Sequence, residues 1–308
     1  MGAFMSKVVA IVNMKGGIGK TTVAVSFAEA SAAMGVKTLL IDLDLQINAS
    51  ISLIGNCEDD FLPWRRHHTI EDYLENRWHG HKPDAHIYFL QFGQPHLLSG
   101  SPSLTIFERR LLIACNNVFQ AKCHLSQWMN EILEEAKSNF DLIICDTPPG
   151  LSLLAEAVIR SADQIVVPQV PDRLSTQGLQ LYARYLRDEL QLPNVAERTN
   201  VFINRFNRAQ TVSKNYAEQI MIDAGRPAFP YSCFENRFSE SVTFKKAMDR
   251  SELGDLRNVS FRQLWGAASD EVIAATRELW TLLGWIEENE SENVIGTRPE
   301  ISSAFSYI

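Results

Sequence analysis

The sequence is poor in cysteine and lacks the spacings that make cysteine informative. Its five cysteines are an odd number and include no C-x-x-C pair, which disfavours a disulfide framework and a zinc site. No apolar run approaches the roughly 18–20 residues that span a bilayer. The first residues, Met1–Val8, are too short and too weakly apolar for a signal peptide. These absences predict a cytoplasmic protein.

An overall excess of positive charge is also missing. The net charge of −8 argues against a globally basic nucleic-acid binder. The charge is uneven, however: residues 197–250 contain nine Lys and Arg against six Asp and Glu, whereas residues 251–308 contain four against ten. A modestly basic stretch therefore precedes an acidic one, and a local basic patch can act where the total charge does not.

Short apolar strands alternate with helical segments along the chain. A strand at Lys7–Asn13, a helix at Lys20–Met34 and a strand at Lys37–Leu43 form a βαβ unit, which predicts parallel pairing with a right-handed crossover. Further strands are expected at 141–145, 165–168 and 201–204, and further helices at 69–75, 101–110 and 126–137. This alternation predicts a doubly wound, mostly parallel α/β sheet with helices on both faces and a helical C-terminal extension.

The length of 308 residues is acceptable for one large α/β domain with insertions. We expect a single domain over residues 1–288, with a surface insertion at about 56–94. Residues 289–308 are polar and are expected to form a loosely ordered tail.

The turn after the first strand carries a phosphate-binding pattern. It ends in Gly-Lys-Thr like the general G-x-x-x-x-G-K-[ST] loop, although Met14 replaces the opening glycine. Its glycines allow backbone N–H groups to turn inward, and the following helix N-terminus adds further donors for phosphate. Lys20 is expected between the β- and γ-phosphates, Thr21 on Mg²⁺ and Thr22 on the α-phosphate. A Gly-rich turn that only joins strand to helix is the weaker interpretation.

The segment Lys15–Thr22 (KGGIGKTT) resembles the deviant Walker A box of the ParA/MinD superfamily of P-loop ATPases. Residues 41–46 (IDLDLQ) resemble that family's switch I, and residues 141–150 (DLIICDTPPG) resemble its Walker B and switch II segments. Leu45 and Ile47 depart from the common switch I pattern, which has proline and glycine there. The resemblance extends with gaps from Lys7 to Met248.

The resemblance implies a role for each of these segments. Lys15 would reach the phosphates of the partner subunit in an ATP-sandwich homodimer, so that Lys15 and Lys20 both act catalytically. Asp44 would position the attacking water and contact Mg²⁺, Asp42 would support the loop, and Asp146 would hold Mg²⁺ through its water shell. The residues expected to bind ATP through the loop are Lys15, Gly16, Gly17, Ile18, Gly19, Lys20, Thr21 and Thr22.

Weaker similarities continue downstream. Residues 161–170 with Gly178, and residues 238–248, resemble later segments of the family. Asn204 matches a position where the family contacts adenine, a role that suits an amide able to donate and accept. A turn residue at a strand end is an equally good interpretation of Asn204. Pro230 matches a position where the family's backbone lines the base.

The resemblance is closest to the ParA-like members, which bind DNA non-specifically in the ATP state and position a plasmid, a chromosome or a protein assembly. It implies a nucleoid-associated ATPase with slow basal hydrolysis and a ParB-like or cargo-borne stimulating partner. Lys and Arg contacts to phosphate would supply the DNA affinity. The candidates in the basic stretch are Arg205, Arg208, Lys214, Arg226, Arg237, Lys245, Lys246 and Arg250.

Two other classes share the ATP chemistry. A MinD-like membrane ATPase would end in a basic amphipathic helix, whereas residues 293–308 hold one arginine. Ala274–Trp285 is more amphipathic, but packing is the commoner fate of such a stripe, and the acidic residues after it would be repelled by anionic lipid. No membrane association is therefore expected. An ATP-dependent metabolic kinase or synthetase of the same fold is the second alternative.

Overall fold

A computed structural model describes residues 5–55, 68–81, 93–226, 229–250 and 259–287. Its centre is a seven-stranded sheet in the order β3-β2-β4-β1-β5-β6-β7, and all the strand pairs are parallel. The strands are β1 (Lys7–Ile11), β2 (Thr38–Asp42), β3 (His96–Leu98), β4 (Leu142–Asp146), β5 (Gln164–Gln169), β6 (Thr199–Ile203) and β7 (Ser232–Cys233). The predicted doubly wound parallel sheet is confirmed. The short edge strands β3 and β7 were not predicted.

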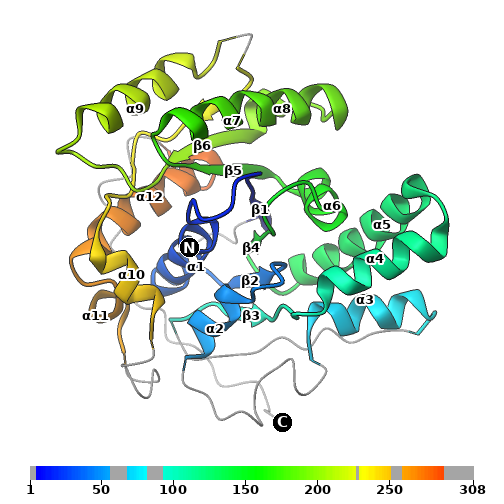
Figure 1. Cartoon of the computed structure of the whole chain (residues 1–308). Helices are drawn as coiled ribbons and strands as arrows, with labels where there is room; N and C mark the ends of the chain where they lie inside the picture. Colours follow the sequence, from blue (N-terminus) through cyan, green and yellow to red (C-terminus); the bar gives the residue numbers. More distant parts are fainter. Residues whose placement is uncertain (1–4, 56–67, 82–92, 227–228, 251–258, 288–308) are drawn as a thin grey trace.

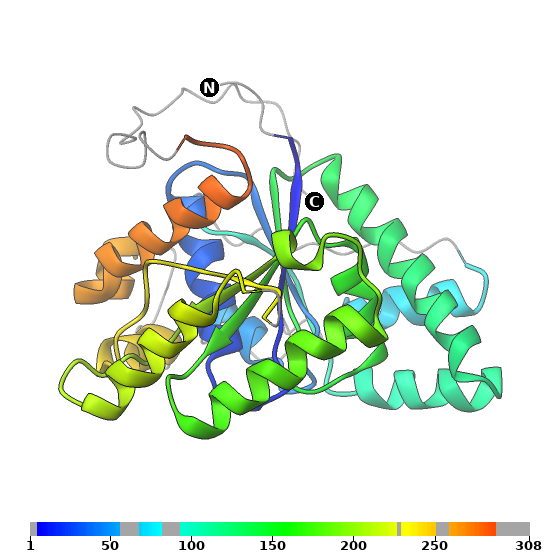
Figure 2. The ribbon, with the colours of Figure 1, turned by 90° about the horizontal axis from the view of Figure 1, so that it is seen from above.

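Helices cover both faces of the sheet (Figures 1 and 2). On one face lie α1 (Lys20–Ala33), α2 (Asn48–Ile54), α10 (Val242–Met248), α11 (Phe261–Trp265) and α12 (Ser269–Leu282). The other face is covered by α3 (Ile70–Trp78), α4 (Leu104–Cys115), α5 (Val118–Lys137), α6 (Leu153–Ser161), α7 (Arg173–Arg184), α8 (Val195–Arg198) and α9 (Thr211–Asp223). A short π-helix, η3 (Tyr185–Glu189), follows α7, and a short 3₁₀ helix, η5 (Gly266–Ala268), follows α11.

The central strands are buried on both faces. In β1, Val8 and Ala10 pack into one apolar cluster, whereas Val9 and Ile11 pack into the other. Successive strand residues point to opposite faces, so a strand covered on both sides needs a continuous apolar run. This explains the unbroken apolar character of the segment that precedes the phosphate loop.

The C-terminal helix α12 packs against α1, the helix that follows the phosphate loop. Leu279, Trp280 and Leu283 are buried in the same cluster as α1, and the Trp280 indole donates to Ser31 Oγ at 3.2 Å. The apolar stripe predicted at 274–285 therefore serves core packing. No helix in the described part of the chain is long and apolar enough to cross a membrane.

The region expected as an insertion is only partly described. The predicted helix at 69–75 is observed as α3, and Thr69 caps it together with Asp72 in a capping box. The helix predicted at 126–137 begins earlier, at Val118, where Asn117 accepts a hydrogen bond from the Phe119 amide. Residues 56–67 and 82–92, and the predicted tail at 289–308, lie outside the described residues.

Candidate functional site

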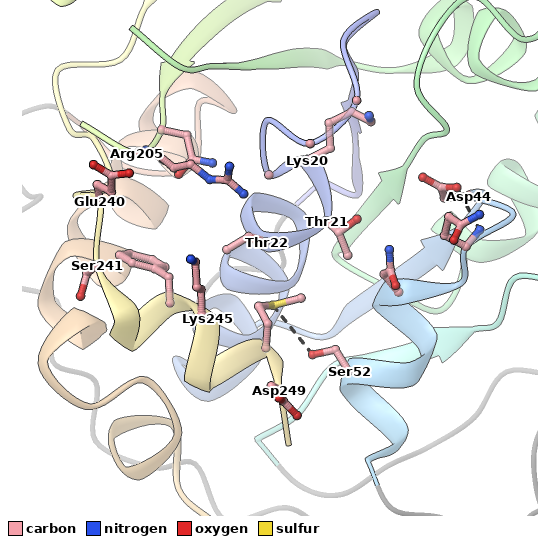
Figure 3. Close-up of a pocket in the computed structure, with 18 of the residues that line it drawn as sticks. Lys20, Thr21, Thr22, Asp44, Ser52, Arg205, Glu240, Ser241, Lys245 and Asp249 are labelled. Carbon is pink, nitrogen blue, oxygen red and sulfur yellow. Dashed lines mark hydrogen bonds between the residues drawn. The ribbon is translucent and has the colours of Figure 1, made fainter. Parts of the chain in front are cut away.

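A cavity of about 810 Å³ opens beside the carboxyl ends of the central strands (Figure 3). Ligands of open α/β sheets bind at this edge. Five parts of the chain meet there: the phosphate loop with the start of α1, the switch I segment with α2, Pro149 after β4, the residues just after β6, and the segments before and within α10. The lining residues include Gly16, Gly17, Gly19, Lys20, Thr21, Thr22, Asp44, Asn204, Arg205, Ser241 and Lys245.

The phosphate loop turns through two glycines in left-handed backbone conformations. Gly17 has φ 75° and Gly19 has φ 89°, values that glycine adopts without steric cost. Asn204, at the end of β6, braces this turn by donating from Nδ2 to the Ile18 carbonyl at 2.7 Å. A Cβ atom on Gly19 would lie 2.3 Å from Asn204 Nδ2. Position 19 therefore requires glycine while Asn204 holds the loop.

Asn204 uses both ends of its amide inside the protein. Its Oδ1 accepts from the Arg205 backbone N–H at 2.9 Å, and the side chain lines the cavity. The structure thus gives Asn204 a bracing function that the sequence did not indicate. Its contact with adenine stays a prediction.

A buried ammonium faces buried carboxylates at the bottom of the cavity. Lys20, the first residue of α1, is 6% exposed. Burial lowers the pKa of Lys20, while the nearby Asp146 and Asp44 carboxylates raise it. In a low-dielectric site such a fixed charge interacts strongly with an anionic ligand. Lys20 is therefore placed to bind a phosphate group.

Asp146 ends β4 and is fully buried. Burial raises the pKa of this carboxyl well above its usual range and Asp42 raises it further, whereas the Thr21 hydroxyl and Lys20 lower it. Neither carboxylate oxygen has a hydrogen bond of normal geometry within the described residues. Buried polar groups normally have a hydrogen-bonding or ionic partner, and a bound cation can serve as the partner of the Asp146 carboxylate.

Asp146, Thr21 and Asp44 together offer the oxygen donors that Mg²⁺ prefers. The described residues contain no group of three or more His, Cys, Asp or Glu side chains arranged around a metal. Mg²⁺ does not need one, because it binds through one or two carboxylates, waters and the phosphates of the nucleotide. The donor set at this site fits that pattern.

The switch I turn is held by Asp42 at the end of β2. The fully buried Asp42 carboxylate accepts hydrogen bonds from the Asp44 amide at 3.1 Å, the Ser50 amide at 2.8 Å and the Ser50 hydroxyl at 2.7 Å. Burial raises the pKa of Asp42 to about 6, although the hydrogen bonds from Ser50 oppose the rise. Asp44 Oδ1 in turn accepts from the Gln46 amide at 3.0 Å. Asp42 supports the loop that carries Asp44, as expected.

The Lys15 side chain extends from the phosphate loop to the start of α7, and Lys15 does not line the cavity. Its Nζ donates to Ser175 Oγ at 2.7 Å and lies 3.4 Å from Asp172 Oδ2. The side chain is 46% exposed, so it is accessible to groups of another subunit. Within one chain, therefore, the two lysines of the phosphate loop are separated: Lys20 is inside the pocket and Lys15 is beside α7.

The far side of the cavity differs from the expectation based on sequence. Pro230 is buried and is not among the lining residues. The wall is formed instead by Ser239, Glu240, Val242, Met248 and Asp249 from the α10 region and by Asn48, Ile51 and Ser52 from α2. The resemblance of residues 238–248 to the family pointed to the α10 segment without assigning it a role. No sequence signal pointed to α2.

The candidate DNA-binding residues fall into distinct groups. Arg250 is 3% exposed and pairs with the buried Glu29 at 2.8 Å, so it is unavailable to DNA, and that prediction is corrected. Arg226 pairs with Asp223 at 2.9 Å, and the Arg237 guanidinium lies 4.5 Å from the ring centre of Phe206. Arg205 and Lys245 line the cavity. Arg208, Lys214 and Lys246 are exposed on the surface.

Known proteins resemble this chain in sequence and in fold. A family model described as an AAA domain matches residues 6–198. The chromosome partitioning protein ParA of Caulobacter vibrioides is 28% identical over 253 residues, which cover 80% of this chain and 87% of that protein. For some other relatives the chain spans less of their length: 56% for ParA of Myxococcus xanthus and 45% for a putative replication protein A of Rhizobium rhizogenes.

Two solved structures show the same fold. An aspartate-to-alanine variant of McdA from Cyanothece in complex with ATP superposes with a TM-score of 0.63 at 19% identity, covering 87% of this chain and 97% of McdA. Cobyrinic acid a,c-diamide synthase from Mycobacterium smegmatis, with a bound ATP analogue and magnesium, superposes with a TM-score of 0.56 at 24% identity, covering 70% and 78% of the two chains.

Proposed function

The chain belongs to the AAA-domain family that matches residues 6–198 and is a ParA-like P-loop ATPase by its relatives, and we propose that it binds Mg·ATP in the cavity beside β1. It would hydrolyse the ATP slowly and use this cycle to position a cargo on DNA. The observation that carries the proposal is that Lys20 and Asp44 line one pocket around the phosphate loop, with the buried Asp146 close enough to Lys20 to raise its pKa.

The residues of the phosphate loop would bind and orient the nucleotide. The backbone N–H groups of the turn and of the α1 N-terminus would contact phosphate oxygens, and Lys20 would neutralise charge at the β- and γ-phosphates. Asp146, Thr21 and Asp44 would hold Mg²⁺, which when bound neutralises charge that develops on the transferring phosphoryl group. Asp44, fixed by its own loop, would orient the attacking water.

Lys15 would act across a subunit interface. It is tied in the single chain to Asp172, the N-cap of α7, and to Ser175 in its first turn. The ion pair with Asp172 is exposed, and such a pair costs little to break. On formation of an ATP-bound homodimer Lys15 would leave these residues and contact the partner's nucleotide, in the manner of an arginine finger. The basal rate would be slow because this cation is not in place in one subunit alone.

The DNA contact would come from exposed cations after β6, on α9 and on α10. Arg208 lies between β6 and α9, Lys214 lies on α9, and Lys246 lies on α10. Binding through phosphate contacts is independent of base sequence and falls steeply with salt. The protein would then associate with the nucleoid, and a ParB-like or cargo-borne partner would stimulate hydrolysis and release.

The test has two parts. Calorimetry with Mg·ATP should show binding to the intact protein, and chelation of Mg²⁺ should weaken it, because part of the affinity passes through the metal ligands. A DNA gel shift with ATP, ADP and no nucleotide across a salt series should show retention with ATP only, on any sequence. Absence of heat on titration would refute the ATPase assignment, whereas ATP binding without DNA retention would refute only the DNA step.

A further inference from the structure

Ile47, in the switch I turn between β2 and α2, has an unusual backbone conformation. Its φ is 47° and its ψ is 29°, in the left-handed region. The other described non-glycine residues with positive φ are Asn116, Gln191, Asn194 and Arg205, so Ile47 is the only β-branched one among them. A β-branched residue is an outlier in this region, and such strain persists only where the surrounding structure enforces it.

Two backbone hydrogen bonds fix Ile47 in this conformation. Its amide donates to the Asp44 carbonyl at 2.9 Å, and its carbonyl accepts from the Ile51 amide at 2.9 Å in the first turn of α2. The residue therefore joins the turn that carries Asp44 to the helix that lines the cavity. A change in the backbone at Ile47 would be transmitted to Asp44 through a single hydrogen bond.

Gly100, which follows β3, provides the space for the Ile47 side chain. Ile47 is 6% exposed, and a Cβ atom on Gly100 would lie 3.1 Å from Ile47 Cγ2 and 2.9 Å from the Asp42 carbonyl oxygen. Gly100 does not have a positive φ, so glycine is required here for close approach and not for conformation. Ile47 thus lies directly against the backbone at the end of β3.

Ser50 connects the same three segments on the polar side. Its hydroxyl donates to Asp42 and accepts from the Gly100 amide at 3.2 Å and from the Ser99 hydroxyl at 3.1 Å. Switch I, the start of α2 and the end of β3 therefore form one closed unit. Asp44 belongs to this unit and faces the cavity that also contains Lys20 and Thr21 (Figure 3).

We propose that Ile47 is a positioning residue for hydrolysis: seated against Gly100, it holds the switch I turn so that Asp44 is already oriented toward the phosphate loop when nucleotide binds. The inference rests on the proposed ATPase function and adds a residue to it that touches neither nucleotide nor metal. Preorganised groups accelerate the chemical step more than they strengthen substrate binding. A residue that acts through Asp44 should therefore change kcat and leave ATP affinity alone.

The experiment compares three variants in single-turnover hydrolysis of Mg·ATP, with ATP affinity measured by calorimetry. Ile47→Ala removes the Cγ2 contact with Gly100 and is expected to lower the rate constant about tenfold with affinity within about twofold, because a small misplacement of a catalytic group is costly. Ile47→Val keeps the β-branched contact and should restore most of the rate. Ile220→Ala removes a fully buried isoleucine of α9 and controls for general loss of packing.

A rate equal to wild type in a folded Ile47→Ala protein would overturn the inference, as would an equal rate loss in Ile220→Ala. If Ile47→Ala does not fold, Gly100→Ala tests the same contact from the other side, since its Cβ would lie 3.1 Å from Ile47 Cγ2 as well as 2.9 Å from the Asp42 carbonyl oxygen. A normal rate in that variant would equally overturn the inference. Failure of the ATPase proposal is distinguishable, because the wild-type protein itself would then not hydrolyse ATP.

Discussion

The two sides of the cavity are built differently. The phosphate side consists of side chains at the start of α1 and at or just after the ends of β2 and β4, and they are nearly inaccessible: Lys20 is 6% exposed, Asp44 8% and Asp146 0%. The opposite side consists of exposed groups such as Arg205 and Lys245, supplied by segments after β6 and around α10. Charges on the first side act at low dielectric, whereas those on the second are screened by water and salt.

This difference predicts which side of the cavity tolerates amino-acid substitutions. On the phosphate side each group is fixed by backbone register, burial and neighbouring hydrogen bonds, so a substitution disturbs several partners at once. On the opposite side a substitution changes one solvated contact. Substitutions on the phosphate side should therefore have the larger effects, with one exception that the structure identifies at Arg250.

The largest expected effect is on the phosphate side, from Lys20→Ala. Removing a buried ammonium that faces the phosphate site should lower Mg·ATP affinity by at least about 100-fold, since charge-assisted contacts at such sites are strong. Calorimetry on the folded variant measures it. Lys7→Ala is the matched control, because Lys7 lies at the other end of the β1–α1 segment and pairs with Asp163. Undiminished affinity in Lys20→Ala would show that the loop does not bind the triphosphate.

Arg250 follows α10 and does not line the cavity. It is a buried cation in the segment that supplies the exposed side, so substituting it should have a large effect. Its Nη2 bonds Glu29 Oε1 at 2.8 Å, and the Trp265 indole donates to Glu29 Oε2 at 2.8 Å. Arg250→Ala leaves Glu29 charged and buried, which should lower the free energy of unfolding by about 3–5 kcal/mol. Urea unfolding measures this. In the same assay Lys246→Ala, at an exposed position, should change the free energy of unfolding by no more than about 0.5 kcal/mol. Similar losses of stability in the two variants would show that the burial of Arg250 does not set its importance.

The phosphate side was largely predictable from the sequence, and the opposite side was not. The phosphate loop, Asp44 and Asp146 each follow a predicted strand, and parallel strands place their carboxyl ends at one edge, so local pattern and topology suffice to bring them together. Ile11 and Asp42 are both in register with Asp146 in the sheet, as that argument requires.

The opposite side depends on contacts between segments distant in the chain, which local patterns do not encode. The pairing of Arg250 with Glu29 spans 221 positions, and nothing in a basic stretch indicates which arginine is buried. The helical stripe at 274–285 likewise gave no indication that α1 would be its partner. The contact of Ile47 with Gly100 escaped prediction because it depends on β3, a three-residue edge strand.

Asp44→Ala tests whether the phosphate side separates binding from chemistry. Asp44 is expected to orient water and to contact Mg²⁺ beside Asp146 and Thr21, so its loss should weaken Mg·ATP binding far less than it slows hydrolysis. Hydrolysis should fall about 100-fold, the lower range for loss of a group acting on a transferred proton or water. Single-turnover hydrolysis and calorimetry give the two values, and light scattering should show an accumulated dimer with ATP. Asp188→Ala, in a surface ion pair with Arg187, is the control. Normal turnover in Asp44→Ala would assign the water to another residue.

The smallest effect is expected from a single exposed cation, Lys246→Ala. Lys246 lies on α10, next to the cavity-lining Lys245, so DNA bound there would lie against the nucleotide-dependent side of the protein. Loss of one phosphate contact should reduce the slope of log affinity against log salt by about one and weaken binding alike on unrelated sequences. ATP-dependent DNA binding measured by anisotropy across a salt series gives the slope, with Lys137→Ala on α5, whose side chain pairs with Glu134, as the control. Because Lys246 does not line the cavity, ATP affinity should not change. An unchanged salt slope would place the DNA surface away from α10. An equal change in Lys137→Ala would mean that the protein's overall charge, and not a surface at α10, determines the binding.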